Sequence, residues 1–343
     1  MTLKITTNLG GTASHIVVGK VAHGLMTMTR AVAHSDEELF EAIKAGVDEL
    51  PIGAKMVLNS AEFYGTPDNQ LANLQMLSRF YEAHPDYVEK TFLMVKGGMH
   101  FEGFKFRADS SMEHLRKSID NCNAALRGTK KVDVFQPARV DRSRPIEETI
   151  RNLVVLKEEG KFDHIGLSEC KAETVRRAHA VHTISVVEIE VSIWSYEEET
   201  KKVIEATREL GIAVTGYAPL GRGFLTGQIN SMDDIPANDF RRIMTRFKQY
   251  FDQNLASANA IRAIAEKKGV TPAQLAIAWV AQLGPHVLPL PGSSSKKRTL
   301  ENLAGGDVAL TEAEVAEVAE VVEKYPVQGD RYFGNDEAAG IWG

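Results

Sequence analysis

Two residues that could move a proton follow separate apolar stretches of the chain. Lys96 ends the stretch 91–96 and is followed by two glycines, so we expect its ammonium to point into the mouth of the fold. Tyr64 comes shortly after the stretch 55–60. A lysine ammonium beside a phenol lowers the pKa of that phenol from about 10. The pair therefore predicts Tyr64 as a proton donor near neutral pH; the alternative is an aromatic plug at the rim and a surface lysine.

Further polar side chains stand at the ends of later apolar stretches or inside them. Ser168 and Glu169 follow the stretch 164–167, whereas Glu188 and Glu190 lie inside an apolar stretch of their own. A buried carboxylate is costly without a partner. These two glutamates should therefore either bind ligand groups or form structural pairs, and the residues alone favour structural pairs.

A candidate anion site follows the last apolar stretch, 286–290. Hydroxyl and basic side chains come just before or within the start of a predicted helix over 297–302; they are Ser293, Ser294, Ser295, Lys296, Lys297 and Arg298. The N-terminus of a helix attracts anions through its free N–H groups and its dipole, and arginine adds charge-assisted hydrogen bonds. The alternative is a capped and solvated helix start. Nearby in the predicted fold, Tyr217 could stack on a flat ligand.

Metal or thiol chemistry is not indicated by the remaining candidates. His179 and His182 are spaced by three, but no third ligand follows them, and no set of residues matches a closed zinc site. Cys170 lies near Ser168, yet no histidine is placed in the sequence to activate it. The two cysteines, Cys122 and Cys170, form no disulfide framework, which suggests a reducing compartment.

Eight apolar stretches alternate with longer amphipathic ones, and these elements must position the candidate residues. The predicted strands are 20–25, 55–60, 91–96, 132–135, 164–167, 186–191, 212–217 and 286–290. The predicted helices are 36–50, 69–82, 112–126, 146–159, 172–180, 197–210, 252–268, 272–282, 297–302 and 311–324. Continuous apolar strands are typical of a parallel sheet buried on both faces. Eight strand–helix units predict a single-domain α/β fold over 1–343, a (β/α)8 TIM barrel.

Three other features complete the predicted barrel. The segment 3–19 alternates like a β-hairpin with its turn at Gly10-Gly11, and Ser35 is placed as the N-cap of the first helix. A long loop is expected over 219–250, after the seventh strand. In such a barrel the chemistry lies at the C-terminal ends of the strands. A doubly wound sheet is the runner-up, but the Gly-rich turn it requires does not follow the first strand.

Composition narrows the functional classes. The formal net charge is −6 and 43% of the residues are hydrophobic, which excludes intrinsic disorder and argues against binding nucleic acid or an anionic membrane. The longest mostly apolar stretch, 272–283, is shorter than the ~20 residues that span a bilayer. Since the first residues show no signal-peptide pattern, we expect a cytoplasmic protein.

Four segments resemble the aldo-keto reductase family, and together they cover nearly the whole chain. Asn59-Ser-Ala-Glu-Phe-Tyr64-Gly65 is similar to the family's Asp-Thr-Ala-x-x-Tyr-Gly segment. The segments 156–168, 216–227 and 288–292, the last with Glu301-Asn302, are similar to three further family motifs. The resemblance implies a barrel enzyme that uses NADPH to reduce carbonyl groups, with a tetrad of Asp, Tyr, Lys and His.

The resemblance also marks two departures from that tetrad. Tyr64 and Lys96 match the family's Tyr and Lys, but Asn59 stands at the Asp position and Ala138 at the His position. Asn59 can still accept a hydrogen bond from Lys96, although it carries no charge. Both departures, together with the Ser168-Glu169 pair in place of Ser-Asn, are similar to one branch of the family, the fungal pyridoxal reductases.

The family pattern further implies which groups hold NADPH. The nicotinamide carboxamide is expected at Ser168, Glu169 and Glu188, the last two standing at the positions of the family's Asn and Gln. Tyr217 is expected to stack under the nicotinamide ring. The other implied cofactor residues are Leu220, Gly221 and Gly223 at the pyrophosphate, Ser293, Ser294 and Arg298 at the 2′-phosphate, and Glu301 and Asn302 at the adenine.

The activity implied is reduction of an aldehyde to an alcohol, most specifically pyridoxal to pyridoxine, with Tyr64 as proton donor. Two alternatives remain open from the sequence. One is an aldehyde reductase of broad specificity. The other is an NADPH-binding regulatory subunit that resembles the β subunits of potassium channels and turns over slowly.

Overall fold

Eight parallel strands form the central sheet of the computed structural model, which describes residues 3–30, 34–102, 105–237, 239–332 and 339–343. They are β3 (His23–Gly24), β4 (Met56–Ala61), β5 (Thr91–Gly97), β8 (Val134–Pro137), β9 (His164–Ser168), β10 (Val186–Glu190), β11 (Ala213–Tyr217) and β12 (Val287–Leu290), in the sheet order β12-β11-β10-β9-β8-β5-β4-β3. The first and last strands meet through a parallel bridge from Gly24 to Gly292 and a bond from the Gly24 N–H to the Pro291 carbonyl of 2.9 Å. The predicted (β/α)8 barrel is confirmed.

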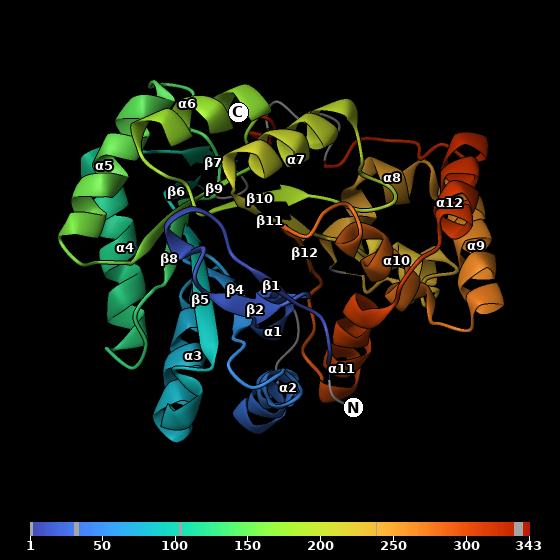
Figure 1. Ribbon diagram of the computed structural model, residues 1–343, viewed down its shortest axis with the longest axis horizontal. Helices are drawn as coiled ribbons and strands as arrows, with labels where there is room; N and C mark the ends of the chain where they lie inside the picture. Colours follow the sequence, from blue (N-terminus) through green and yellow to red (C-terminus); the bar gives the residue numbers. More distant parts are fainter. Residues whose placement is uncertain (1–2, 31–33, 103–104, 238, 333–338) are drawn as a thin grey trace.

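Helices surround the sheet and cover its outer face (Figure 1). They are α1 (Met26–Thr29), α2 (Asp36–Asp48), α3 (Ala72–Ala83), α4 (Met112–Leu126), α5 (Ile146–Glu158), α6 (Ala172–Val181), α7 (Glu198–Leu210), α8 (Thr245–Lys248), α9 (Phe251–Lys268), α10 (Pro272–Ala281), α11 (Lys296–Ala304) and α12 (Glu312–Lys324). Ser35 caps α2 as predicted, because its hydroxyl accepts the Glu38 N–H while the Glu38 carboxylate accepts the Ser35 N–H. Among the described residues no helix is both long and apolar enough to cross a bilayer.

The N-terminal hairpin closes the end of the barrel opposite the strand C-termini. Strands β1 (Thr6–Asn8) and β2 (Val17–Gly19) pair antiparallel, as expected, but the turn continues beyond Gly10-Gly11 as a 3-10 helix, Gly11–Ala13. A Cβ on Gly10 would lie 2.3 Å from the backbone nitrogen of Ala213, so only glycine lets the turn approach the sheet this closely. Leu9 and Ala13 join the apolar layer inside the barrel.

Several predictions of local structure were incomplete or wrong. The first strand was expected over 20–25, but β3 spans only His23–Gly24, and α1 follows it where no helix was expected. A second hairpin, β6 (Met99–Glu102) with β7 (Lys105–Ala108), follows β5 where no element was expected. The loop after β11 contains short 3-10 helices and α8. The fourth strand of the barrel was expected over 132–135, whereas β8 spans Val134–Pro137 and therefore includes Gln136.

Candidate active site

Lys96 stands at the end of β5 with its side chain inside the barrel. It is only 4% exposed. The parallel register sets it beside Gln136 of β8. A Cβ on the following residue, Gly97, would lie 2.3 Å from the Ser118 hydroxyl, so glycine allows the strand to end against α4. The expectation that Lys96 points away from solvent is therefore met.

Two buried polar side chains, Asn59 and Glu188, contact the Lys96 ammonium, and Gln136 joins them through Glu188. The ammonium lies 3.0 Å from Glu188 Oε1 and donates to Asn59 Oδ1. Glu188 Oε2 accepts hydrogen bonds from Asn59 Nδ2 at 2.6 Å and from Gln136 Nε2 at 2.7 Å. We call Asn59, Lys96, Gln136 and Glu188 the lysine centre. Because β4 and β10 are not neighbours in the sheet, Asn59 and Glu188 meet across the barrel interior.

The lysine centre keeps its cation charged. Burial alone would lower the pKa of Lys96, but the attraction of Glu188 and of Tyr64 outweighs it, so the pKa of Lys96 is raised. Gln136 was not among the expected site residues. A polar residue in an apolar strand was the available signal, and the expected strand 132–135 ended before it.

Tyr64 lies on the loop after β4, with its ring centre 5.0 Å from the Lys96 ammonium. The loop is fixed by a bond from the Thr29 hydroxyl to the Tyr64 carbonyl of 2.7 Å. A Cβ on the next residue, Gly65, would lie 2.0 Å from the Asn69 carbonyl oxygen, which explains a glycine there. The structure thus brings the proposed proton donor and its lysine together.

The sign of the Tyr64 shift differs from the sequence-based expectation. Burial raises the pKa of Tyr64, and the attraction of Lys96 lowers it by less, so the net pKa is above 10. The expected lowering is therefore wrong for the structure described. A raised pKa keeps the phenol protonated at neutral pH, which is the state that a proton donor requires.

Ala138 offers no polar group where the family pattern has histidine. It is 2% exposed and directly follows β8, where its N–H donates to the Gly97 carbonyl at 3.0 Å. The next residue, Arg139, turns toward the C-terminal segment and donates to the Ala339 carbonyl at 3.0 Å and to the Tyr332 hydroxyl at 3.3 Å. This arginine therefore holds the tail of the chain.

Two consecutive residues at the end of β9 carry buried polar atoms that have no partner in the described part of the chain. Ser168 Oγ and Glu169 Oε2 form no hydrogen bond with any of the residues that the structure describes. The backbone of Glu169 is left-handed, with φ 53°, and its N–H donates to the Glu188 carbonyl at 2.9 Å. In chemical type, a hydroxyl donor and a carboxylate acceptor match the two ends of a primary carboxamide. The pair therefore fits the nicotinamide group assigned to it.

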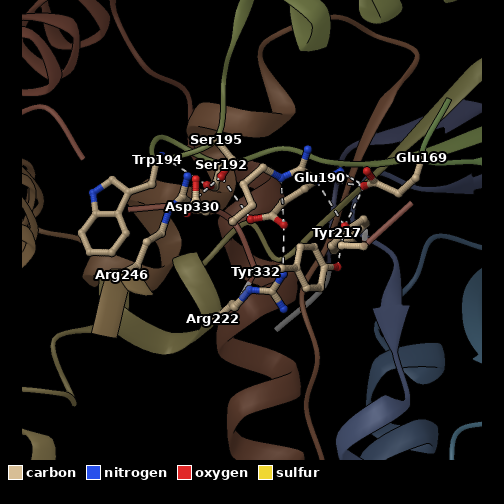
Figure 2. A network of polar contacts seen from close by, with 12 residues as sticks. Glu169, Glu190, Ser192, Trp194, Ser195, Tyr217, Arg222, Arg246, Asp330 and Tyr332 are labelled. Carbon is tan, nitrogen blue, oxygen red and sulfur yellow. Dashed lines mark hydrogen bonds and ion pairs between the residues drawn. The ribbon is translucent and has the colours of Figure 1, made fainter. Parts of the chain in front are cut away.

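The other oxygen of Glu169, Oε1, belongs to a second buried cluster, which includes residues of the C-terminal segment after α12 (Figure 2). Glu169 Oε1 accepts from the Tyr217 hydroxyl at 2.6 Å and from Arg331 Nη2 at 2.9 Å. Arg331, only 1% exposed, also lies 3.3 Å from Glu190 Oε2. We call this cluster the tail network; its members are Glu169, Glu190, Tyr217, Arg222, Arg331 and Tyr332.

Arginines decide the charge states in the tail network. Burial would raise the pKa of Glu190, but Arg222 and Arg331 outweigh it and lower the pKa to about 2. Arg222 Nη2 lies 3.0 Å from Glu190 Oε2, and its guanidinium lies 4.7 Å above the Tyr332 ring. Burial likewise opposes the shift at Tyr332, whose pKa falls below 10 because Arg222 and Arg139 attract its phenolate. Glu190 thus forms the structural pair expected from the sequence, whereas Arg331 and Tyr332 were not foreseen.

The expected pyrophosphate loop begins right after β11 and turns sharply. Gly221, Arg222 and Gly223 have φ of 55°, 56° and 96°, so three consecutive residues are left-handed. Glycine tolerates this conformation, whereas Arg222 is held in it by Glu190. Leu220 precedes the turn, and its carbonyl accepts the Gly223 N–H at 3.0 Å.

The expected phosphate residues gather at the start of α11. Ser295 caps the helix by accepting the Arg298 N–H. Arg298 Nη2 donates to the hydroxyl of the buried Ser294 at 3.1 Å, and the buried Ser293 hydroxyl donates to the Ser295 carbonyl at 3.0 Å. A guanidinium and hydroxyls at a helix N-terminus fit a phosphate. Two further expected residues, Glu301 and Asn302, lie on the same helix.

Other reactive groups lie outside the lysine centre and the tail network. His100, Asp109 and His114 lie close enough to hold a metal ion. However, the two imidazole rings stack at 3.8 Å, and Arg107 lies 3.4 Å from the Asp109 carboxylate. Both cysteines are free and buried. Burial raises the pKa of Cys170 far above its ordinary value, so its thiol stays protonated and unreactive.

Comparisons with known proteins identify the family of the chain. The Aldo/keto reductase family matches residues 20–323. The chain is 34% identical to aldo-keto reductase str7 of Strobilurus tenacellus, covering 92% of both chains. It is 33% identical to probable pyridoxal reductase 2 of Schizosaccharomyces pombe, covering 92% of this chain and 95% of that protein. It is 36% identical to probable aldo-keto reductase 1 of Glycine max over 80% of this chain and 78% of that one.

A solved structure supports the fold separately. The glycerol dehydrogenase AKR11B4 of Gluconobacter oxydans superposes with a TM-score of 0.77 and 24% identity, covering 96% of this chain and 98% of that one. At that identity the similarity shows the barrel alone. Since the family match spans most of the sequence and the two fungal relatives align along most of their own length, the chain belongs to the aldo/keto reductase family.

Proposed function

We propose that the protein reduces an aldehyde to an alcohol with NADPH, and that its substrate is pyridoxal. The observation that carries the proposal is a protonated phenol, Tyr64, beside a buried and charged lysine, Lys96. A phenol so placed can give its proton to a carbonyl oxygen, and the ammonium stabilises the phenolate left behind. The described residues form one barrel, and we propose that the chain is a single catalytic domain.

The residues of the site fit the cofactor. When bound, NADPH supplies a hydride for the carbonyl carbon. Ser168 Oγ would donate to the nicotinamide carboxamide and Glu169 Oε2 would accept from it, because both atoms are buried and lack a partner among the described residues. Tyr217 would stack against the ring. The loop from Leu220 would pass along the pyrophosphate, while Ser294 and Arg298 would meet the 2′-phosphate.

A hydride and the Tyr64 proton together account for the product. The carbonyl oxygen would receive the Tyr64 proton while the carbonyl carbon takes the hydride that the cofactor would supply, so the aldehyde would become an alcohol. Tyr64 regains its proton from solvent. Ala138 has no group that could polarise the carbonyl, which favours an aldehyde as substrate because aldehydes are more electrophilic than ketones.

Pyridoxal is such an aldehyde. Its phenolic hydroxyl stands next to the aldehyde and can donate a hydrogen bond to the carbonyl oxygen within the molecule, in place of the absent histidine. The similarity to a probable pyridoxal reductase supports the same choice. The cytosolic location expected from the composition stays a prediction.

The test is steady-state oxidation of NADPH with purified protein and the Tyr64→Phe variant. Tyr64→Phe keeps the ring but removes the proton, so we expect kcat for pyridoxal to fall by at least about a hundredfold with the Kd for NADPH unchanged. Tyr325→Phe is the control, since this tyrosine lies at the end of α12. Turnover by Tyr64→Phe near the wild-type rate would refute the mechanism.

A panel of substrates separates pyridoxal from the alternatives. We expect kcat/KM for pyridoxal to exceed that for benzaldehyde, which lacks the neighbouring hydroxyl, and that for salicylaldehyde to lie between them. Equal values would indicate an aldehyde reductase of broad specificity. Tight binding of NADPH with negligible turnover of every aldehyde would indicate a regulatory subunit instead.

A further inference from the structure

The tetrad pattern does not explain which group balances the charge of Lys96 in the lysine centre. Lys96 is 4% exposed, and the residue at the tetrad's acidic position is the neutral Asn59. A buried ammonium without a counter-charge loses its proton as its pKa falls. Some other group must therefore supply the negative charge, or Lys96 could not stabilise a phenolate.

We propose that Glu188 supplies this charge, so that the carboxylate of the tetrad has moved from position 59 to position 188. Glu188 is 3% exposed and lies 3.0 Å from the Lys96 ammonium through Oε1. Its Oε2 accepts N–H groups from Asn59, Gln136 and Lys96 at 2.6, 2.7 and 3.3 Å. Only the ionised form of a carboxyl group accepts on both oxygens without donating.

The residues at positions 59 and 188 constrain each other. Asn59 turns its amide oxygen toward Lys96 and its amide nitrogen toward Glu188. An aspartate at 59 would set a second carboxylate where the 2.6 Å hydrogen bond now lies, and the two charges would repel. The family pattern of Asp at 59 with Gln at 188 has thus become Asn with Glu. The exchange leaves the charge around Lys96 unchanged.

This inference rests on the proposed function and gives Glu188 a different task from the one expected from sequence. Both oxygens of Glu188 are engaged inside the lysine centre. Ser168 Oγ and Glu169 Oε2, which have no partner among the residues described, would instead meet the carboxamide. Glu188 is therefore a positioning residue that acts through Lys96. It holds the ammonium charged and aimed at Tyr64.

The experiment compares Glu188→Gln with the double variant Asn59→Asp/Glu188→Gln. We expect Glu188→Gln to lower kcat about a hundredfold, to leave the Kd for NADPH unchanged, and to move the alkaline limb of the pH–rate profile to lower pH. The double variant restores one carboxylate beside Lys96. It should recover kcat to within about tenfold of wild type and return the alkaline limb to its original place.

Glu190→Gln is the matched control, since it neutralises the next inward carboxylate on the same strand and should leave the alkaline limb in place. If Glu188→Gln retains kcat and instead weakens NADPH, Glu188 holds the carboxamide and the inference is overturned. If Glu188→Gln fails to fold, the double variant still decides, because the exchange requires that it folds. A double variant that does not fold, or that gains nothing over Glu188→Gln, contradicts the exchange.

A titration without turnover separates this inference from the proposed function. Lysines carrying ¹³C-methyl groups report the pKa of Lys96 by NMR, with Lys96→Arg identifying its signal. The pKa should fall in Glu188→Gln and recover in the double variant even if no aldehyde is reduced. An unchanged pKa in Glu188→Gln would refute the counter-ion role, whatever the activity of the wild type.

Discussion

The lysine centre and the tail network are both buried ionic clusters at the C-terminal ends of the barrel strands, but they are built differently. The lysine centre holds one carboxylate, one cation and two amides, all from strands β4, β5, β8 and β10. The tail network holds two carboxylates, and its cations come from the loop after β11 and from residues beyond α12. One cluster is therefore part of the sheet, and the other is closed by the end of the chain.

The two clusters therefore differ in how easily they can rearrange. Strand register fixes Lys96 beside Gln136, so the lysine centre cannot rearrange without breaking the sheet. Arg331 instead reaches Glu169 and Glu190 from an irregular segment. Segments outside the regular elements open at lower free energy than sheet interiors. If the proposed function holds, the chemistry depends on the lysine centre, whereas Arg331 of the tail network ties the C-terminal segment to the barrel strands.

The largest effect is expected when the lysine centre loses its cation. Lys96→Met leaves Glu188 buried and unpaired, which costs about 3–5 kcal/mol of the free energy of unfolding, and it lowers kcat by about a thousandfold. Lys130→Met is the matched control, because Lys130 is also buried and lies 3.0 Å from Asp133. The control should lose stability but keep kcat. Urea denaturation and steady-state rates measure both; similar kcat values in the two variants would remove the distinction.

Removing the corresponding cation of the tail network should affect stability more than chemistry. Arg331→Met leaves Glu190 with Arg222 but deprives Glu169 of its ion pair, so we expect a loss of about 3 kcal/mol with kcat within about tenfold of wild type. Limited proteolysis should cut the C-terminal segment faster. Arg177→Met, which breaks a surface pair with Glu147, serves as control. A collapse of kcat as deep as that of Lys96→Met would place Arg331 in the chemistry.

The loss of folding stability at acidic pH tests the contribution of Glu190 to the tail network. Arg222 and Arg331 lower its pKa from 4.5 to about 2, so the folded form stays ionised where the unfolded chain already binds a proton. Its stabilisation is complete above about pH 4.5 and is lost as the pH falls toward 2. Glu190→Gln should lower stability at pH 7 by roughly 3 kcal/mol and flatten the profile in that window. An unchanged slope would show that Glu190 does not contribute.

The smallest effect is expected from removing a positive charge that lies outside both clusters. Arg298→Ala removes a guanidinium from the start of α11, where it contacts Ser294. We expect the Kd for NADPH to rise by about tenfold, since a charge-assisted bond is worth roughly 1.5–3 kcal/mol, while NADH binding stays unchanged. Lys296→Ala is the control, because Lys296 already pairs with Glu41 at 2.8 Å. Equal weakening of both cofactors would mean that Arg298 supports the helix instead.

The pattern of apolar and polar residues along the chain was sufficient to predict the fold. The helix predicted over 112–126 coincides with α4, and Ser35 caps α2 as expected. Helix and strand periodicity depends on residues within one or two turns of each other, so a single sequence displays it directly. Eight strand–helix units are compatible with few topologies, and the (β/α)8 barrel was predicted on that basis. The error at β8 had the opposite origin, because Gln136 is polar and became a strand residue only through pairing with β5.

The sequence by itself determined the barrel, the family, and the neighbourhood of Tyr64 and Lys96, because each depends on short motifs. Only the tertiary structure decided which charges meet. Asn59 and Glu188 are 129 positions apart, and Glu169 and Arg331 are 162 apart, yet each pair shares a hydrogen bond. The raised pKa of Tyr64 has the same origin, since burial outweighs the nearby cation. Desolvation and Coulomb attraction depend on distance in space, which no spacing along the chain encodes.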